Sequence, residues 1–173
     1  MPTLRILVAS VLLASTPALA HAQASASQPA TGSSTIFLPI VLGKETDLDF
    51  GTIARPSSGT GTITIDPANG ARSLAGQGAL LSNTGASQAA FTVGGESGQT
   101  FSITAPETMT MTREGGGETI VVTLTPSAAE GLLAGPPGGP GSASFGVGGE
   151  LSIANTTVTG AYGGSFTVTV AYN

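Results

Sequence analysis

The chain contains no cysteine and no tryptophan, and its one histidine is His21, close to the N-terminus. Without cysteine there are no disulfides, no thiolate metal ligands and no cysteine nucleophile. Histidine is the most common general base and metal ligand, so its absence from the rest of the chain argues against a Ser-His-Asp triad and most zinc sites. We therefore expect no enzymatic activity, no bound metal and no cofactor.

Charged side chains are also scarce, at 9% of residues against about 25% in a typical soluble domain. Beyond residue 22 the only basic residues are Lys44, Arg55, Arg72 and Arg113, and they face 10 acidic ones. An acidic chain with scattered bases has no electrostatic footprint for nucleic acid or for an anionic membrane surface. The 26 glycines and the many hydroxyl side chains are typical of secreted fibre subunits and surface coats.

Residues 1–22 have the three parts of a secretory signal peptide: a basic start at Arg5, an apolar stretch over residues 6–20, and a small-x-small ending at Ala20 and Ala22. We expect cleavage after Ala22, with cleavage after Ala20 as the alternative. A membrane anchor would need about 20 apolar residues, and this stretch is shorter. The predicted location is the periplasm, the cell surface or an extracellular fibre, without membrane insertion after cleavage.

Residues 23–34 are predicted to be a flexible leader, or an arm that docks on another subunit, because they lack apolar periodicity. Residues 35–173 are predicted to form one domain of half-buried antiparallel strands, since apolar residues alternate with threonine and serine. The clearest alternation covers residues 165–172. The expected strands are 36–42, interrupted or at an edge because of Pro39, and 48–53, 60–65, 90–93, 101–105, 109–111, 119–124 and 165–172.

Glycine-rich turns separate these segments, and residues 94–98 are interpreted as a hairpin turn. Residues 135–141 are predicted to be an irregular loop, and residues 127–133 are the only helical candidate, limited to a single turn by Gly131. Many short strands with glycine-rich turns predict an all-β, antiparallel, Ig-like or pilin-like sandwich. The expected core residues are Phe50, Ile63, Ile65, Phe91, Val93, Phe101, Ile103, Ile120, Val122, Leu124, Leu151, Ile153, Tyr162, Phe166, Val168 and Val170.

Two groups of polar residues have a possible chemical role. Glu45, Asp47 and Asp49 form an acidic cluster that could bind calcium, but the spacing of a calcium loop is missing, which favours a solvated turn. Lys44 is the only lysine and could form an isopeptide bond if buried, although a solvent-facing side chain is the simpler expectation. Paired carboxylates for glycoside hydrolysis could be drawn only from Glu107, Glu114 and Glu118, without an accompanying aromatic platform.

Six motifs in a fixed order resemble the bacterial family called domain of unknown function 4402 over about residues 35–173. They are L-D-F-G-T-I at 48–53, G-T-I-T-I at 61–65, A-A-F-T-V-G-G at 89–95, F-S-I-T at 101–104, V-G-G-E-L at 147–151 and the aromatic ending at 160–173. That family is more distantly similar to the spore-coat-U-like subunits of archaic chaperone–usher pili. Those subunits are Ig-like sandwiches completed by a donor strand from a neighbour. This chain lacks the paired cysteines usual in them.

The resemblance implies a secreted structural or adhesive protein, a fimbria- or pilus-like subunit that assembles by β-strand addition. The implied partners are other copies of the chain, a periplasmic chaperone and an outer-membrane usher. The alternative is a monomeric secreted module that binds a ligand through its glycine-rich loops. The residues expected to take part in assembly are Ile36, Leu38, Ile40 and Leu42 in a donor segment, and Phe166, Val168, Val170 and Tyr172 in the last strand.

Overall fold

The computed structural model describes residues 25–82 and 85–173 of the 173-residue chain. The chain divides into two units, Met1–Thr35 and Ile36–Asn173. In the first unit, residues 25–35 belong to no strand and their side chains are exposed. None of the described residues is helical, so this part of the chain offers no membrane-spanning helix. The predicted signal peptide, residues 1–22, lies outside the described residues.

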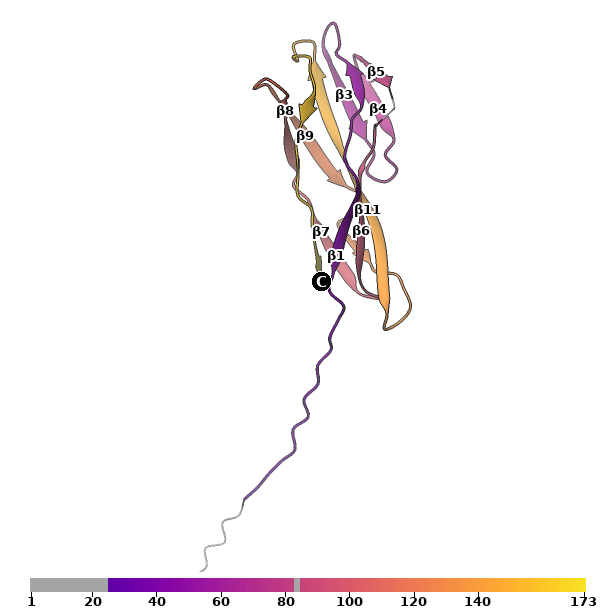
Figure 1. Ribbon diagram of the computed structural model, residues 1–173, viewed down its shortest axis with the longest axis vertical. Coiled ribbons are helices and arrows are strands. Elements are labelled where there is room, and N and C mark those ends of the chain that lie inside the picture. Colours follow the sequence, from indigo (N-terminus) through magenta and orange to yellow (C-terminus); the bar gives the residue numbers. More distant parts are fainter. Residues whose placement is uncertain (1–24, 83–84) are drawn as a thin grey trace, which may run out of the picture. The chain divides into compact units, whose positions relative to one another are not determined.

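The second unit is built from strands, most of them short (Figure 1). Their bounds are β1 Val41–Thr46, β2 Thr52–Ala54, β3 Thr60–Ile65, β4 Arg72–Gly76, β5 Ala79–Ser82, β6 Ala89–Glu96, β7 Thr100–Thr104, β8 Thr108–Arg113, β9 Thr119–Pro126, β10 Glu130–Leu132, β11 Pro140–Ala154, β12 Tyr162–Gly163 and β13 Thr169–Tyr172. The predicted all-β, antiparallel sandwich is confirmed.

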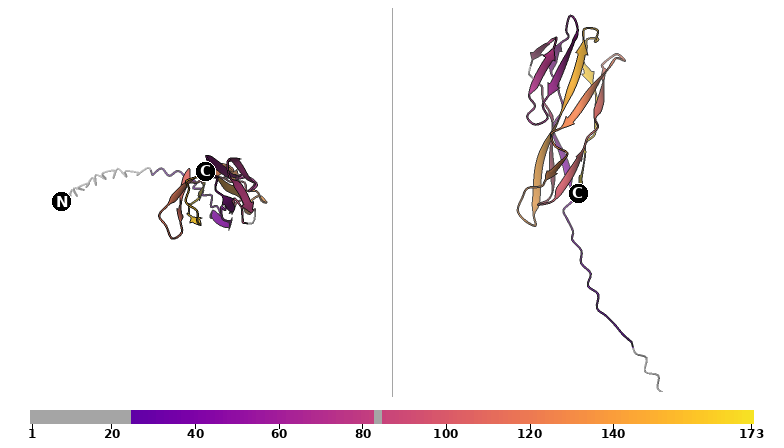
Figure 2. Two further views of the ribbon diagram at one scale, coloured as in Figure 1. Left: turned by 90° about the horizontal axis from the view of Figure 1, so that it is seen from above. Right: turned by 180° about the vertical axis from the view of Figure 1, so that it is seen from behind.

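Strand β11 is shared by three neighbouring strands. Residues 140–147 pair with β6, residues 147–151 with β9, and residues 149–154 with β3, all antiparallel. Val147 pairs with both Ala89 and Pro126, so β6 and β9 lie on opposite edges of β11. Strand β6 continues to β1, β9 continues to β8 and β12, and β3 continues to β4, which completes an eight-stranded sheet. Figures 1 and 2 show β11, in orange, running along the sandwich.

The second layer consists of two smaller sheets. One is three-stranded, in the order β10-β7-β13, and the other is two-stranded, β2 with β5. The chain passes from β6 of the large sheet to β7 of the three-stranded sheet through a turn at residues 97–98. The sequence predicts a hairpin at 94–98, and this prediction is wrong. Gly94 and Gly95 belong to β6, while β7 pairs with β10 and β13, so the turn carries the chain from one sheet to the other.

The core between the layers is apolar, and among the described residues it holds no buried polar or charged side chain. Eleven of the predicted core residues are buried, and Ile120, Phe166, Val168 and Val170 are partly buried against them. Tyr162 is only partly buried and lies outside this cluster. The sequence reading missed five members of the core: Ala89, Met109, Leu133, Phe145 and Val147.

Other predictions of local structure need correction. Residues 127–133 do not form a helical turn, because Glu130–Leu132 is strand β10 and pairs with β7. The predicted strand at 48–53 is interrupted by Gly51, whose φ of 67° is incompatible with an extended chain. Residues 36–40 precede the ladder of β1, in agreement with the strand break expected at Pro39. Of the predicted strand at 165–172, only β13 pairs with another strand. The preceding strand β12 pairs with β8 and β13 pairs with β7, so the chain changes its partner strand between them.

Close backbone contacts explain the glycines of β11. Residues 145–149 are all buried, which means that both faces of the strand are covered there. A Cβ atom on Gly148 would overlap the carbonyl oxygen of Ile65 and lie 2.6 Å from the nitrogen of Pro67. Backbone atoms cannot move away as a flexible side chain can, so a side chain at this position would push β3 away from β11.

We predict that Gly148→Ala lowers the free energy of unfolding by about 1–3 kcal/mol, because it overpacks a site bounded by backbone. The matched control is Gly163→Ala, also within a strand, where an added Cβ would meet no atom within 4 Å. The measurement is urea-induced unfolding followed by circular dichroism. Equal stability of the two variants would contradict the close approach at β11.

Candidate functional site

The predicted donor segment is divided in the structure between exposed and packed residues. Ile36 is 89% exposed and Leu38 is 43% exposed. Ile40 and Leu42 pack against the core of the same chain. Leu42 lies within β1 and is paired with Val93 of β6. Of these four predicted residues, the two that precede Pro39 are therefore the ones available to contact another molecule.

Tyr172, at the end of β13, attaches this segment to the sandwich. Its hydroxyl accepts a hydrogen bond from the Glu96 amide at 2.7 Å and donates one to the Leu38 carbonyl at 2.8 Å. Its ring contacts that of Phe37, with 6.1 Å between the ring centroids. The hydroxyl fits because residue 95 is glycine, since a Cβ atom there would overlap it. One side chain thus joins the N-terminal segment, β6 and β13.

The four predicted residues of the C-terminal strand lie inside their own sandwich. Phe166, Val168, Val170 and Tyr172 are partly buried against the core. Strand β13 pairs with β7 along one edge, and it is the last strand of its sheet. Residues 164–168 form no ladder with either sheet. Strand β13 is therefore the edge strand of the three-stranded sheet, and its other edge pairs with no strand in the described part of the chain.

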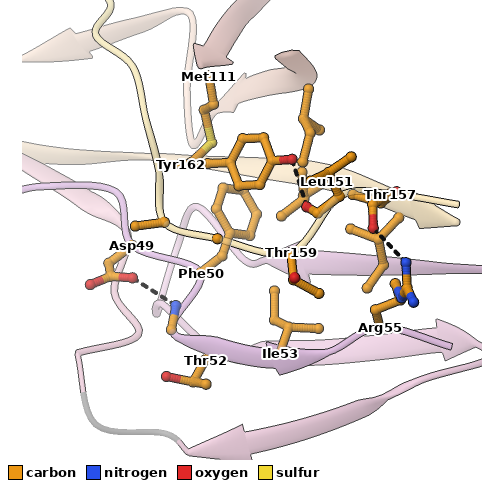
Figure 3. A pocket seen from close by; sticks show the side chains of 16 residues that line it. Asp49, Phe50, Thr52, Ile53, Arg55, Met111, Leu151, Thr157, Thr159 and Tyr162 are labelled. Atoms are coloured by element: carbon orange, nitrogen blue, oxygen red, sulfur yellow. Dashed lines mark hydrogen bonds between the residues drawn. The ribbon is translucent and has the colours of Figure 1, made fainter. Parts of the chain in front are cut away.

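A groove of about 530 Å³ lies at a second place in the sandwich, where the second layer is thin (Figure 3). Its floor is apolar and comes from the eight-stranded sheet: Met111, Ile120, Leu151 and Ile153. One wall is formed by residues 49–55, which include β2, and the other by residues 157–162. None of the residues that line the groove belongs to β5. Strand β5, the one strand that pairs with β2, therefore takes no part in the groove.

The polar groups at the rim of the groove bond mainly to nearby backbone. Arg55 Nη1 donates to the Thr157 carbonyl at 3.0 Å and so joins the two walls at one end. The Tyr162 hydroxyl donates to the Val158 carbonyl at 2.7 Å, and Asp49 Oδ1 accepts from the Gly51 amide at 2.6 Å. Figure 3 shows Asp49 and Arg55 well apart along the groove. These bonds hold the walls in shape. Of the floor residues, Leu151 and Ile153 are buried, and Met111 and Ile120 are only partly buried.

The acidic residues near β1 do not converge on a common point. Asp47 forms an exposed ion pair with Lys44 at 2.6 Å, and Asp49 is occupied by its own backbone turn. Lys44 faces solvent, with a side chain that is 56% exposed. Within residues 25–82 and 85–173, no three acidic or histidine side chains are close enough together to hold a metal ion.

Of the three glutamates considered for glycoside hydrolysis, Glu118 is engaged in an ion pair. Arg113 Nε donates to Glu118 Oε2 at 2.7 Å across the turn between β8 and β9. This hydrogen bond lowers the pKa of the Glu118 carboxyl and raises the pKa of the Arg113 guanidinium. A carboxyl with a lowered pKa is a poor proton donor at neutral pH. The Arg113–Glu118 pair is therefore better described as a surface ion pair that joins the two strands of a hairpin.

Sequence reasoning did not find the groove. Three of its floor residues, Ile120, Leu151 and Ile153, were expected to be ordinary core. Its walls contain two very short strands, β2 and β12, which have little periodicity. The missing signal is a tertiary one, because it depends on which strands of the second layer lie over which part of the large sheet. Of the lining residues, Asp49 was considered only as part of the acidic cluster, and Tyr162 only as a core residue.

We predict that Tyr172→Phe lowers the free energy of unfolding by about 1–2 kcal/mol, because the part-buried Glu96 amide loses its acceptor. The control is Tyr162→Phe, which removes one hydrogen bond to an exposed carbonyl and should cost about 0.5 kcal/mol or less. Urea unfolding of both variants gives the comparison. If Tyr172→Phe cost no more than the control, the linking role of this hydroxyl would be wrong.

Comparison with protein families assigns the chain to one of them. No curated protein matches the chain. A family model described as Domain of unknown function (DUF4402) matches residues 40–172. The match begins one residue before β1 and ends with the last residue of β13, so it includes every strand of the sandwich. The resemblance predicted from the motifs is therefore confirmed, and the chain belongs to the DUF4402 family.

Proposed function

We propose that this protein is an exported structural or adhesive subunit of the cell surface, and that its copies assemble by β-strand addition. The observation that carries the proposal is the segment Ile36-Phe37-Leu38. Its three large apolar side chains are adjacent and exposed, and its residues belong to no ladder. The other exposed large apolar side chains among the described residues lie in strands, with Val158 as the one exception.

The chemistry of this segment suits pairing with another protein. No charged residue occurs from residue 23 to residue 43, so the segment can be buried without placing an unpaired charge in an apolar site. The backbone of residues 36–40 has few partners: the Leu38 amide reaches Glu96 Oε2 at 3.4 Å and the Leu38 carbonyl accepts from Tyr172. An extended segment of this kind gains main-chain hydrogen bonds when it adds to a sheet edge, and its apolar side chains supply the fit.

Export is the second part of the proposal. It rests on the signal-like residues 1–22, and the absence of cysteine is compatible with any redox environment. The periplasmic chaperone and outer-membrane usher remain proposed partners, since a subunit with an exposed apolar segment needs protection before it assembles. The sparse and scattered charges support a structural role over a catalytic one.

The groove supports a second candidate function, a monomeric module that binds a ligand. Its volume of about 530 Å³ lies in the range of sites for small molecules, and Arg55, Thr157 and Tyr162 offer polar groups at its rim. A ligand-binding module would remain monomeric at all protein concentrations, whereas a strand-adding subunit would not. Strand addition is preferred because it also accounts for the exposed apolar segment.

We predict that the exported protein begins at Gln23, and that replacing the small residues of the cleavage site by Ala20→Tyr with Ala22→Tyr leaves residues 1–22 attached. Signal cleavage requires small side chains at these positions. Intact-mass spectrometry of the protein from the culture supernatant and the periplasm measures the outcome, with Ser25→Tyr as a control outside the site. Export of the unmodified chain with Met1 still at its N-terminus would contradict the prediction.

We also predict that the chain from Gln23 to Asn173 forms oligomers whose mean size rises with protein concentration, measured by sedimentation velocity. Removing residues 23–38 should leave a monomer, because Ile36 and Leu38 are lost while Ile40 and Leu42 still pack against the core. The control is removal of residues 23–34, which retains the apolar segment. A full-length mature chain that stays monomeric throughout would rule out strand addition between copies.

A further inference from the structure

We propose that the groove between β2 and residues 157–162 is the acceptor site for assembly, and that its occupant is the segment around Ile36 of a second copy. This inference rests on the proposed function and identifies the site at which it operates. It concerns two parts of the same sandwich, which have no residue in common: the lining of the groove, and the segment held by Tyr172.

The groove has the properties of a position left open in the second layer. Met111, Ile120 and Ile53 line it and are only partly buried, and Val158 on the opposite wall is 41% exposed. Strand β2 forms a ladder with β5 alone, so its other edge has no partner strand among the described residues. The carbonyl of Thr52 in this strand accepts a long hydrogen bond from Arg72 Nη1, at 3.5 Å. A short extended segment placed there can cover the apolar floor and pair with β2.

The occupant must be short, extended, apolar and without charge. The hydrogen bond from Arg55 to Thr157 joins the walls at one end and limits the length of the site. The segment Ile36-Phe37-Leu38 is also short, because Pro39 follows it and has no amide hydrogen to donate to a ladder.

The alternation of side chains selects Ile36 as the residue that enters. In an extended segment, residues 36 and 38 point to one side and residue 37 to the other. Phe37 is held against Tyr172 of its own chain, so Ile36 and Leu38 face away from that contact. Ile36 is the more exposed of the two, at 89%. The segment can therefore stay anchored to its own sandwich by Phe37 while it presents Ile36 to a second copy.

The arrangement makes the contact a head-to-tail one. The segment lies beside β13 and the end of β6, and Figure 1 places β1 and the C-terminus at the lower end of the sandwich, away from β5, β8 and β9. The groove lies next to β8 and β9, to which Met111 and Ile120 belong. A contact between two different surfaces of identical subunits leaves one of each free at the ends, which produces an open fibre unless a ring closes.

The absence of native cysteine permits a direct test with introduced cysteines. In the chain from Gln23 to Asn173, the double variant Ile36→Cys with Val158→Cys is oxidised during assembly. It should give a ladder of covalent multimers on non-reducing gels, with a disulfide between residues 36 and 158 found by peptide mapping. The control variant is Ile36→Cys with Leu132→Cys, because Leu132 is likewise exposed but lies in β10, outside the groove.

A second pair of variants tests the same site without cross-linking. Val158→Arg places a charge on an exposed position of the groove wall and should raise the concentration for half-assembly by about tenfold or more, since one apolar side chain can no longer be buried. Leu132→Arg should leave that concentration unchanged. Thermal unfolding by circular dichroism establishes that both variants keep the fold of the parent chain.

The outcomes separate this inference from the proposed function. If the unmodified chain forms oligomers but the variant with Ile36→Cys and Val158→Cys gives no 36–158 disulfide, or if Val158→Arg assembles as readily as the parent chain, the groove is not the acceptor, while strand addition itself would stand. Equal ladders from the two cysteine pairs would also overturn it. If the unmodified chain forms no oligomers and no 36–158 disulfide appears, both proposals are wrong.

Discussion

The pairing of β11 with three other strands is the constraint on which the rest of this structure depends. One 15-residue strand supplies the ladders of β6, β9 and β3. Each of these strands brings a further part of the large sheet with it, so β11 sets the register of the whole layer. The close approach of Ile65 and Pro67 to Gly148 is the steric condition for this arrangement. Because the contacts are between backbones, no change of rotamer can relieve a larger residue there.

The large sheet is covered unevenly, and this unevenness produces the groove. Phe101 and Ile103 of β7 join Val93 and Phe145 of the large sheet in the core. Met111 and Ile120 are only partly buried, and they line the groove together with residues 49–55 and 157–162. A sandwich without disulfides depends on apolar burial for its stability. The partly exposed apolar side chains of the groove are therefore a place where added apolar surface from a partner would contribute directly to the free energy of association.

The N-terminal segment is held in a way that favours the proposed interaction. Tyr172 attaches the N-terminal segment to the sandwich, which reduces the conformational freedom that the segment would lose on binding. Phe37 occupies one side of the segment and leaves Ile36 on the other. Few charges are needed for any of these contacts, which accords with a chain in which only 9% of residues are charged.

Much of the sandwich was predictable from local pattern. Strands with clear alternation, such as β3, β6, β7 and β9, were found with small errors at their ends, because a half-buried strand imposes a period of two on its residues. Strands β4, β5, β10 and β12 were missed, since they lie at sheet edges or are very short and bury few side chains. Of β11 only residues 147–151 were recognised, through the family motif, because residues 145–149 are all buried and do not alternate. The turn at Ser97–Gly98 was read as a hairpin because a tight turn looks the same in sequence whether its strands pair or separate.

The candidate site was only half accessible from the sequence. The apolar segment at Ile36 and Leu38 is visible in the printed residues, and so are the absence of cysteine and the lack of histidine beyond His21. What the amino-acid sequence determined by itself was the class of the fold, the apolar composition of its core and the chemistry that it lacks, because these follow from residue types and short-range periodicity. Tertiary structure alone decided which strands share β11, that Tyr172 holds the N-terminal segment, and that a groove remains beside β2. These depend on contacts between residues far apart in the chain, for which a single sequence carries no local signal.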